Sequence, residues 1–141
     1  MKLSVTSWSF PQCSFKEAVG LSSLLDINAI DISYFYRSAL DKELLLKDYK
    51  QVVDQINSYD IDYANLYHLF GNSLDDRNLA NIDNLKNNIN DLKTVTDFCV
   101  DANIPSIFVL PGVVNKGQSR TDALKDSIES LKNLIEITSK K

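Results

Sequence analysis

The stretch Ala29-Ile30-Asp31-Ile32-Ser33-Tyr34 is a short apolar run of the kind that forms a buried strand, and it is one of four. Each run is followed by a polar loop and then by a stretch whose apolar residues have helical spacing. The other three runs are Leu3-Ser4-Val5-Thr6-Ser7-Trp8, Tyr63-Ala64-Asn65-Leu66-Tyr67-His68 and Ser106-Ile107-Phe108-Val109-Leu110. Strict alternation of strand and helix predicts a parallel sheet with crossover helices.

Four strand-helix units are half of a closed eight-unit barrel, which typically needs ~250 residues. The chain has 141 residues, and we see no linker and no change of composition that would mark a second domain. We therefore predict an α/β fold: a partial (β/α)8 TIM barrel of four parallel βα units, a half-barrel spanning residues 1–141 as one domain.

The expected helices carry sequence signals for their ends and faces. Ser14 and Glu17 form a capping box that starts the first helix, which we expect to run to about Asp26. The expected caps of the other three are Asp41, Asp83, and Ser119 or Thr121. Their apolar stripes are Leu45, Tyr49, Val52 and Ile56 in the second, Leu85, Ile89, Leu92, Thr96 and Cys99 in the third, and Leu124, Ile128, Leu131 and Ile135 in the fourth. One stripe per helix predicts that each covers one side of the sheet, with the fourth stripe facing inward. Three helix exits carry Asp or Asn, which tolerate the left-handed turn that ends a helix: Asp26-Ile27-Asn28, Asp60-Ile61-Asp62 and Ala102-Asn103-Ile104-Pro105.

Composition narrows the classes of partner. The net charge is −4 and the basic residues are scattered, which argues against nucleic acid, since a phosphate backbone needs clustered Lys and Arg. No segment approaches the ~20 apolar residues of a membrane span, and the first residues turn polar too early for a secretory signal. Cys13 and Cys99 fit no metal-ligand spacing, so we expect two free thiols, as in a reducing cytoplasm.

In parallel α/β folds the functional residues lie at the carboxyl ends of the strands. Trp8, Tyr34 and His68 follow or end three of the predicted strands, and Pro111-Gly112 follows the fourth. A lone His at a strand end is as readily a hydrogen-bonded structural group as a functional one, and it cannot make a metal site that needs three or four ligands. The residue types and their spacing therefore predict no particular catalytic residue and no set of metal ligands.

Three segments resemble the sugar phosphate isomerase/epimerase family of the xylose-isomerase-like TIM barrel superfamily. They are Asn65-Leu66-Tyr67-His68-Leu69-Phe70-Gly71, Arg77-Asn78-Leu79-Ala80-Asn81-Ile82-Asp83 and Phe108-Val109-Leu110-Pro111-Gly112-Val113. The first two strand runs also resemble that family's first two units. The resemblance therefore implies that residues 1–141 are the N-terminal half of such a barrel.

In this family a divalent metal in the central cavity polarises a sugar oxygen while acid and base groups move a proton between neighbouring carbons. The ligand positions lie on strands five to eight, so this chain alone is expected to hold no metal and to be inactive. The resemblance implies substrate-side roles for Trp8, Tyr34, His68, Phe70, Pro111 and Gly112. The implied ligand is a sugar or sugar phosphate.

Two alternatives remain open. The same superfamily contains metal-dependent endonucleases that cut DNA at abasic sites, and His68 falls near one of their ligand positions. That branch also has a His just before the Pro-Gly, where this chain has Leu110. The other alternative is a non-catalytic half-barrel that binds a sugar or forms a homodimer through its open barrel edges, because unpaired edge strands invite pairing with another chain.

Overall fold

The computed structural model describes residues 3–139. The two residues at each end of the predicted domain, residues 1–141, lie outside this range. Within that range, four strands alternate with four α-helices, and a four-stranded sheet has the order β1-β2-β3-β4. The strands are β1 (Val5–Thr6), β2 (Ala29–Ser33), β3 (Asp62–His68) and β4 (Ile107–Val109). The α-helices are α1 (Phe15–Leu24), α2 (Lys42–Ile56), α3 (Leu85–Asp101) and α4 (Arg120–Thr138). Two 3-10 turns, η1 (Ser7–Ser9) and η2 (Ile82–Asn84), complete the order.

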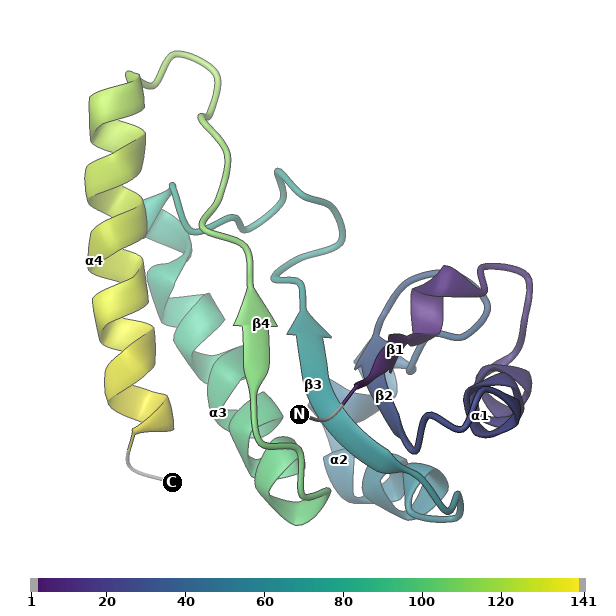
Figure 1. Ribbon diagram of the computed structural model, residues 1–141. Helices are drawn as coiled ribbons and strands as arrows, with labels where there is room; N and C mark the ends of the chain where they lie inside the picture. The colour runs from purple at the N-terminus through teal and green to yellow at the C-terminus, as the bar shows by residue number, and fades with distance from the viewer. Residues whose placement is uncertain (1–2, 140–141) are drawn as a thin grey trace. The chain divides into compact units, whose positions relative to one another are not determined.

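The predicted parallel sheet is confirmed. β1 pairs with β2 and β2 pairs with β3 in parallel, with Thr6 opposite Asp31 and Ser33 opposite Tyr67. The arrows of β3 and β4 point the same way in Figure 1. All four strands therefore bring their carboxyl ends to one edge of the sheet, as the sequence predicted.

The chain divides into two compact units. Within the described range, the first comprises residues 3–68 and 97–108, with the sheet, α1 and α2; the second comprises residues 69–96 and 109–139, with most of α3 and all of α4. The first unit buries the side chains that one face of β2 and β3 presents: Ile30, Ile32 and Leu66 are fully buried. Leu45, Val52 and Ile56 of the predicted α2 stripe are buried as well.

Most of the predicted helix starts are confirmed. Ser14 accepts a hydrogen bond from the Glu17 amide while Glu17 accepts from the Ser14 amide, which is the predicted capping box. Asp41 caps α2 and Ser119 caps α4 through the amides of Leu44 and Asp122. The start of the third helix differs from the prediction, because the capping residue is Asn81 and not Asp83. The Asn81 side chain accepts a hydrogen bond from the Asp83 amide and so caps η2, the tighter turn in which Asp83 lies. Helix α3 follows η2 directly.

The predicted left-handed helix exits are confirmed at two of three places, and the predicted free thiols are confirmed. Asp26 and Asn103 have a left-handed φ, of 56° and 55°, at the ends of α1 and α3, whereas no residue of Asp60-Ile61-Asp62 after α2 has one. Cys13 and Cys99 are free thiols, with Cys99 buried on α3. Burial raises the pKa of the Cys99 thiol to about 12.

The predicted inward stripe of α4 is wrong. Leu124, Ile128 and Ile135 are 61%, 46% and 62% exposed, whereas the buried residues of this helix are Ala123, Ser127, Ser130 and Leu134. The buried face is rotated by one residue because the helix lies close to backbone carbonyls. Ser127 Oγ donates to the carbonyl of Pro111 at 2.7 Å and Ser130 Oγ to that of Leu79 at 2.9 Å. Small hydroxyl side chains suit that approach, whereas larger aliphatic ones do not.

No helix among residues 3–139 combines the length and the apolar character that crossing a membrane requires.

Candidate functional site

An aromatic cluster lies at the carboxyl ends of the strands in the first unit, formed by Trp8, Phe35, Tyr67 and Phe108. Trp8 meets Tyr67 edge to face, with ring centroids 5.3 Å apart, and Phe35 meets Tyr67 in the same way at 5.4 Å. Phe108 stacks on Tyr67 at 4.5 Å, and Trp8 meets Phe35 at 6.2 Å. Tyr67 is thus the centre of the cluster, and each of the four strands, or the loop that follows it, supplies one ring.

The strand register explains why these rings meet. Ser33 lies opposite Tyr67, so the residues that follow each strand stay in step across the sheet. Successive side chains point to opposite faces of a strand, so neighbouring rings separate into two groups. Phe35 and Tyr67 fall into the aromatic cluster, whereas Tyr34 and His68 form a second contact.

The second contact is a hydrogen bond between Tyr34 Oη and His68 Nδ1 at 3.1 Å. The His68 ring is fully buried, and the Tyr34 ring meets it at 82°. The ammonium of Lys42 lies 5.6 Å from the centre of the Tyr34 ring, within the range of a cation–π attraction. A phenol paired with an imidazole can hold or pass a proton.

Polar side chains occupy the same sheet nearer its amino end. Ser4 Oγ donates to both carboxylate oxygens of Asp31 at 3.2 Å, and Ser106 Oγ donates to Asn65 Oδ1 at 3.0 Å. Burial raises the pKa of Asp31, and the hydrogen bond from Ser4 opposes that rise. The ionised carboxylate is therefore less favourable in the folded chain than in water.

Replacing Asp31 by Asn is expected to stabilise the fold at neutral pH. The raised pKa means that Asp31 contributes its full stability below its ordinary pKa of ~3.9, and that this contribution is lost as the pH rises through the folded pKa. Asn has the same shape and no charge, so Asp31→Asn should raise the Tm at pH 7 and leave it unchanged at pH 3. Circular dichroism during heating measures both values. Asp62→Asn, at an exposed position of β3, is the control, and a lower Tm for Asp31→Asn at pH 7 would contradict the expectation.

The structure places the predicted site residues in both units. Trp8 joins the aromatic cluster, and Tyr34 and His68 bind each other. Phe70, Pro111 and Gly112 belong to the second unit, where Phe70 is buried and the Pro111 carbonyl accepts the Ser127 hydroxyl. Gly112 has a φ of 106°, and a Cβ there would lie 2.5 Å from the Ala80 amide nitrogen. Close backbone packing therefore accounts for this glycine.

Sequence reasoning missed Phe35, Tyr67 and Phe108. The signal that could have found them is the alternation of side chains along a strand, since Tyr67 lies one residue before the chosen His68 and Phe35 one residue after the chosen Tyr34. Choosing the last residue of these two apolar runs, without its neighbour, left Phe35 and Tyr67 out of the prediction.

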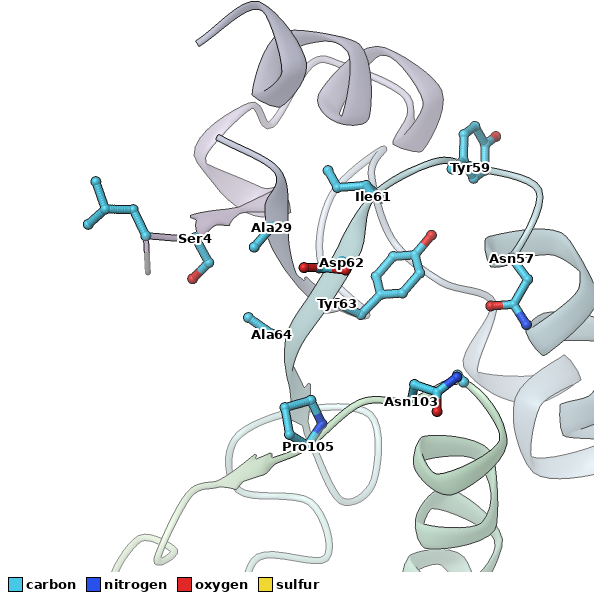
Figure 2. Close-up of a pocket in the computed structure, with 12 residues that line it drawn as sticks. Ser4, Ala29, Asn57, Tyr59, Ile61, Asp62, Tyr63, Ala64, Asn103 and Pro105 are labelled. Atoms are coloured by element: carbon cyan, nitrogen blue, oxygen red, sulfur yellow. The ribbon is translucent and has the colours of Figure 1, made fainter. Parts of the chain in front are cut away.

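A different pocket lies at the amino ends of the strands and has a volume of about 550 Å³. Figure 2 shows Asp62, at the start of β3, and Pro105, just before β4, on its border. Two tyrosines, Tyr59 and Tyr63, line the pocket. Tyr63 Oη donates a hydrogen bond to the Ile56 carbonyl at 2.6 Å, and burial raises the Tyr63 pKa. In parallel α/β folds this end of the sheet serves stability, so the pocket is not the candidate site.

Among residues 3–139, no three His, Cys, Asp or Glu side chains come together as a metal site would require. The residues of this range therefore do not by themselves supply a ligand set for a divalent metal. In the second unit, Arg77 forms an ion pair with Asp91 at 2.8 Å, which gives this loop arginine a structural partner.

The fold of this chain matches part of two solved structures. A D-tagatose 3-epimerase-like protein superposes with a TM-score of 0.69 and 17% identity, over 99% of this chain and 49% of that protein. A xylose isomerase domain protein from Planctomyces limnophilus superposes with a TM-score of 0.58 and 11% identity, over 99% of this chain and 50% of that protein. The chain thus shares the fold of about half of each of these proteins and spans about half of their length.

No protein-family model matches the sequence. No curated protein matches it either.

Proposed function

We propose that this chain is the substrate-side half of a sugar isomerase or epimerase barrel, and that its aromatic cluster binds the apolar face of a sugar or sugar phosphate. The observation that carries the proposal is the meeting of Trp8, Phe35, Tyr67 and Phe108 at the carboxyl ends of the strands. Aromatic faces offer large contact area with little loss of side-chain freedom. The superposed proteins, by their names, belong with sugar epimerases and isomerases.

The Tyr34–His68 pair supplies the polar part of the proposed site. The imidazole is buried and fixed by the phenol at Nδ1, so its orientation is set before a sugar arrives. In the complete barrel we propose that this pair hydrogen-bonds a sugar hydroxyl, while a divalent metal and the proton-transferring groups come from the other half. This half alone is then expected to bind sugar without converting it.

The sequence provides its own reporter for sugar binding. Trp8 is the only tryptophan and lies inside the aromatic cluster, so its fluorescence should respond to a bound sugar. Titration with D-tagatose and D-xylose is expected to give a saturable change with a roughly millimolar dissociation constant, as suits a small ligand. Nuclear magnetic resonance of the same sugars should show no new isomer.

Two variants distinguish binding by the aromatic cluster from an unspecific change. Tyr67→Ala removes the central ring and should weaken sugar binding by about tenfold or more. Phe15→Ala removes a ring that contacts Tyr59 and Tyr63 instead, so it should leave the sugar affinity unchanged. Fluorescence that stays constant up to molar sugar, or equal effects of both variants, would refute the proposed site.

The remaining functional predictions rest on sequence alone. The free thiols support the proposal of a reducing, cytoplasmic location. The abasic-site endonuclease stays an alternative that no contact in residues 3–139 favours, and DNA cleavage by the complete protein is its test. A homodimer through the open sheet edges also stays a prediction.

A further inference from the structure

The pocket at the amino ends of the strands has the size and the lining of a small-molecule site. Its volume of about 550 Å³ lies within the ~300–1,000 Å³ that ligand pockets usually have. Its apolar lining includes Tyr59, Tyr63, Ala29, Ala64 and Pro105, which Figure 2 shows around the pocket. All its described lining residues belong to the first unit, so the pocket is a feature of that unit alone.

Three polar side chains of the lining are open to a ligand. They are Asn57, Asp62 and Asn103, and all three are solvent-exposed. No hydrogen bond or ion pair engages these side chains within residues 3–139. Asp62 is the only acidic or basic residue of that range in the lining. The pocket therefore offers a ligand one carboxylate and two amide groups.

Two helix ends add negative potential to the pocket. Asn57 is the C-cap of α2, and Ala102 and Asn103 directly follow α3. The C-terminal end of a helix carries about half a negative charge, which a Lys or Arg in the last turn commonly offsets. Neither α2 nor α3 has a basic residue in its last turn. The two helix ends therefore favour a cation in the pocket.

The loops at this end of the sheet carry charge of the same sign. Residues 25–28, 57–62 and 101–106 contain no Lys or Arg, and their acidic residues are Asp26, Asp60, Asp62 and Asp101. The Asn28 carbonyl accepts a hydrogen bond from the Asp62 amide at 3.0 Å, which places the first of these loops beside the pocket. A cleft lined by one sign of charge concentrates ions of the opposite sign. The charges thus disfavour a phosphate and favour a cation.

The lining also selects an organic cation over a metal ion. Calcium takes ~6–8 oxygen ligands, whereas one carboxylate lines the pocket. A primary ammonium has three N–H donors and needs fewer partners. Its alkyl chain suits the apolar lining, and tyrosine rings attract cations as well.

We propose that this pocket binds a small organic cation, with a primary ammonium at the Asp62 carboxylate and an aliphatic chain against Tyr59 and Tyr63. The aromatic cluster lies at the opposite ends of the strands, so this site is separate from the proposed sugar site and does not depend on it. The amino ends of the strands serve stability in such folds. A cation bound there should therefore stabilise the fold and take no part in the reaction.

Isothermal titration calorimetry with putrescine at low ionic strength tests the site. Putrescine is expected to bind with a roughly millimolar dissociation constant, to bind more weakly as salt is added, and to raise the Tm. The uncharged diol of the same chain length should not bind. Nα-acetyl-lysine amide presents the same ammonium as a protein side chain does, so the tighter of the two amines identifies the source of the ligand.

Two substitutions separate binding in the pocket from a general effect of charge. Asp62→Asn should weaken putrescine binding about tenfold or more, because the ammonium loses a charged hydrogen-bond partner. Asp48→Asn is the matched control: it removes the same charge from an exposed position of α2 that does not line the pocket, and it should leave the affinity unchanged. Circular dichroism should show that both variants remain folded.

Nuclear magnetic resonance locates the bound amine. Putrescine should shift the backbone amide signals of residues 57–64 and 102–105. The proposal is overturned if neither amine binds, if the diol binds as well as putrescine, or if the two substitutions have equal effects. Shifts confined to other residues overturn it as well.

Discussion

Gly112→Ala is expected to destabilise the second unit by about 3 kcal/mol or more. Gly112 has a φ of 106°, a region that side chains rarely adopt, and a Cβ would lie 2.5 Å from the Ala80 nitrogen and 2.9 Å from Asn78 Oδ1. Backbone strain costs ~1–3 kcal/mol, and overpacking adds ~1–3 kcal/mol. Urea unfolding followed by circular dichroism measures the free energy of unfolding.

Two other glycines separate strain from crowding. Gly117 has a φ of 80°, and a Cβ at this position would meet no atom of residues 3–139 within 4 Å, so Gly117→Ala should cost only ~1–2 kcal/mol of strain. Gly20 lies within α1 in open space, and Gly20→Ala should stabilise the chain by ~0.5–1 kcal/mol. Equal losses at Gly112 and Gly117 would show that close packing is not the reason for Gly112.

Asn78→Ala is expected to cost about 3–5 kcal/mol, although Asn78 is a polar loop residue. Its side-chain amide donates to the Asp75 carbonyl and to Asn115 Oδ1, both at 2.9 Å. Its Oδ1 accepts from the amides of Ala80 at 3.0 Å and Val113 at 3.3 Å. The side chain is 5% exposed, so its removal leaves partners buried and unsatisfied, at ~1–3 kcal/mol each.

The matched control for this prediction is Asn84→Ala. Asn84 makes one long side-chain hydrogen bond, to the Asn78 carbonyl at 3.3 Å, and its loss should cost ~0.5–1.5 kcal/mol. A double-mutant cycle of Asn78→Ala with Asn115→Ala should give a coupling energy of ~0.5–3 kcal/mol, since the two amides are bonded. Independent, additive effects of the two substitutions would contradict the proposed network.

The side-chain amides of Asn78, Asn115 and Gln118 form a hydrogen-bond network that lies in and beside two of the segments that carried the family resemblance. Asn78 lies in the first of two loops of the second unit, and Asn115 lies in the second. Asn115 Nδ2 and Gln118 Nε2 both donate to the Ala80 carbonyl, at 3.2 and 2.6 Å. In this chain, these hydrogen bonds give the loop residues a structural role. The sequence predicted substrate-binding roles for Pro111 and Gly112 of these segments and no role for the segment that contains Asn78.

The aromatic cluster shows which site residues can be predicted from residue types alone and which require the register of the paired strands. The sequence placed aromatic residues after the strands, and the prediction that the strand ends carry the site selected Trp8 and Tyr34. Tyr67 remained unselected because it sits inside the strand. Only the pairing of Ser33 with Tyr67 brings its ring between Phe35 and Phe108.

The sequence by itself determined the parallel βα order, the helix caps of α1, α2 and α4, and the left-handed exits at Asp26 and Asn103. Each depends on residues within a few positions of one another, where spacing and hydrogen-bonding capacity decide the outcome. The tertiary structure alone decided which face of α4 is buried, which rings meet, and why Gly112 must lack a side chain. Those outcomes depend on atoms far apart in the chain, such as the Leu79 and Pro111 carbonyls beneath the serines of α4.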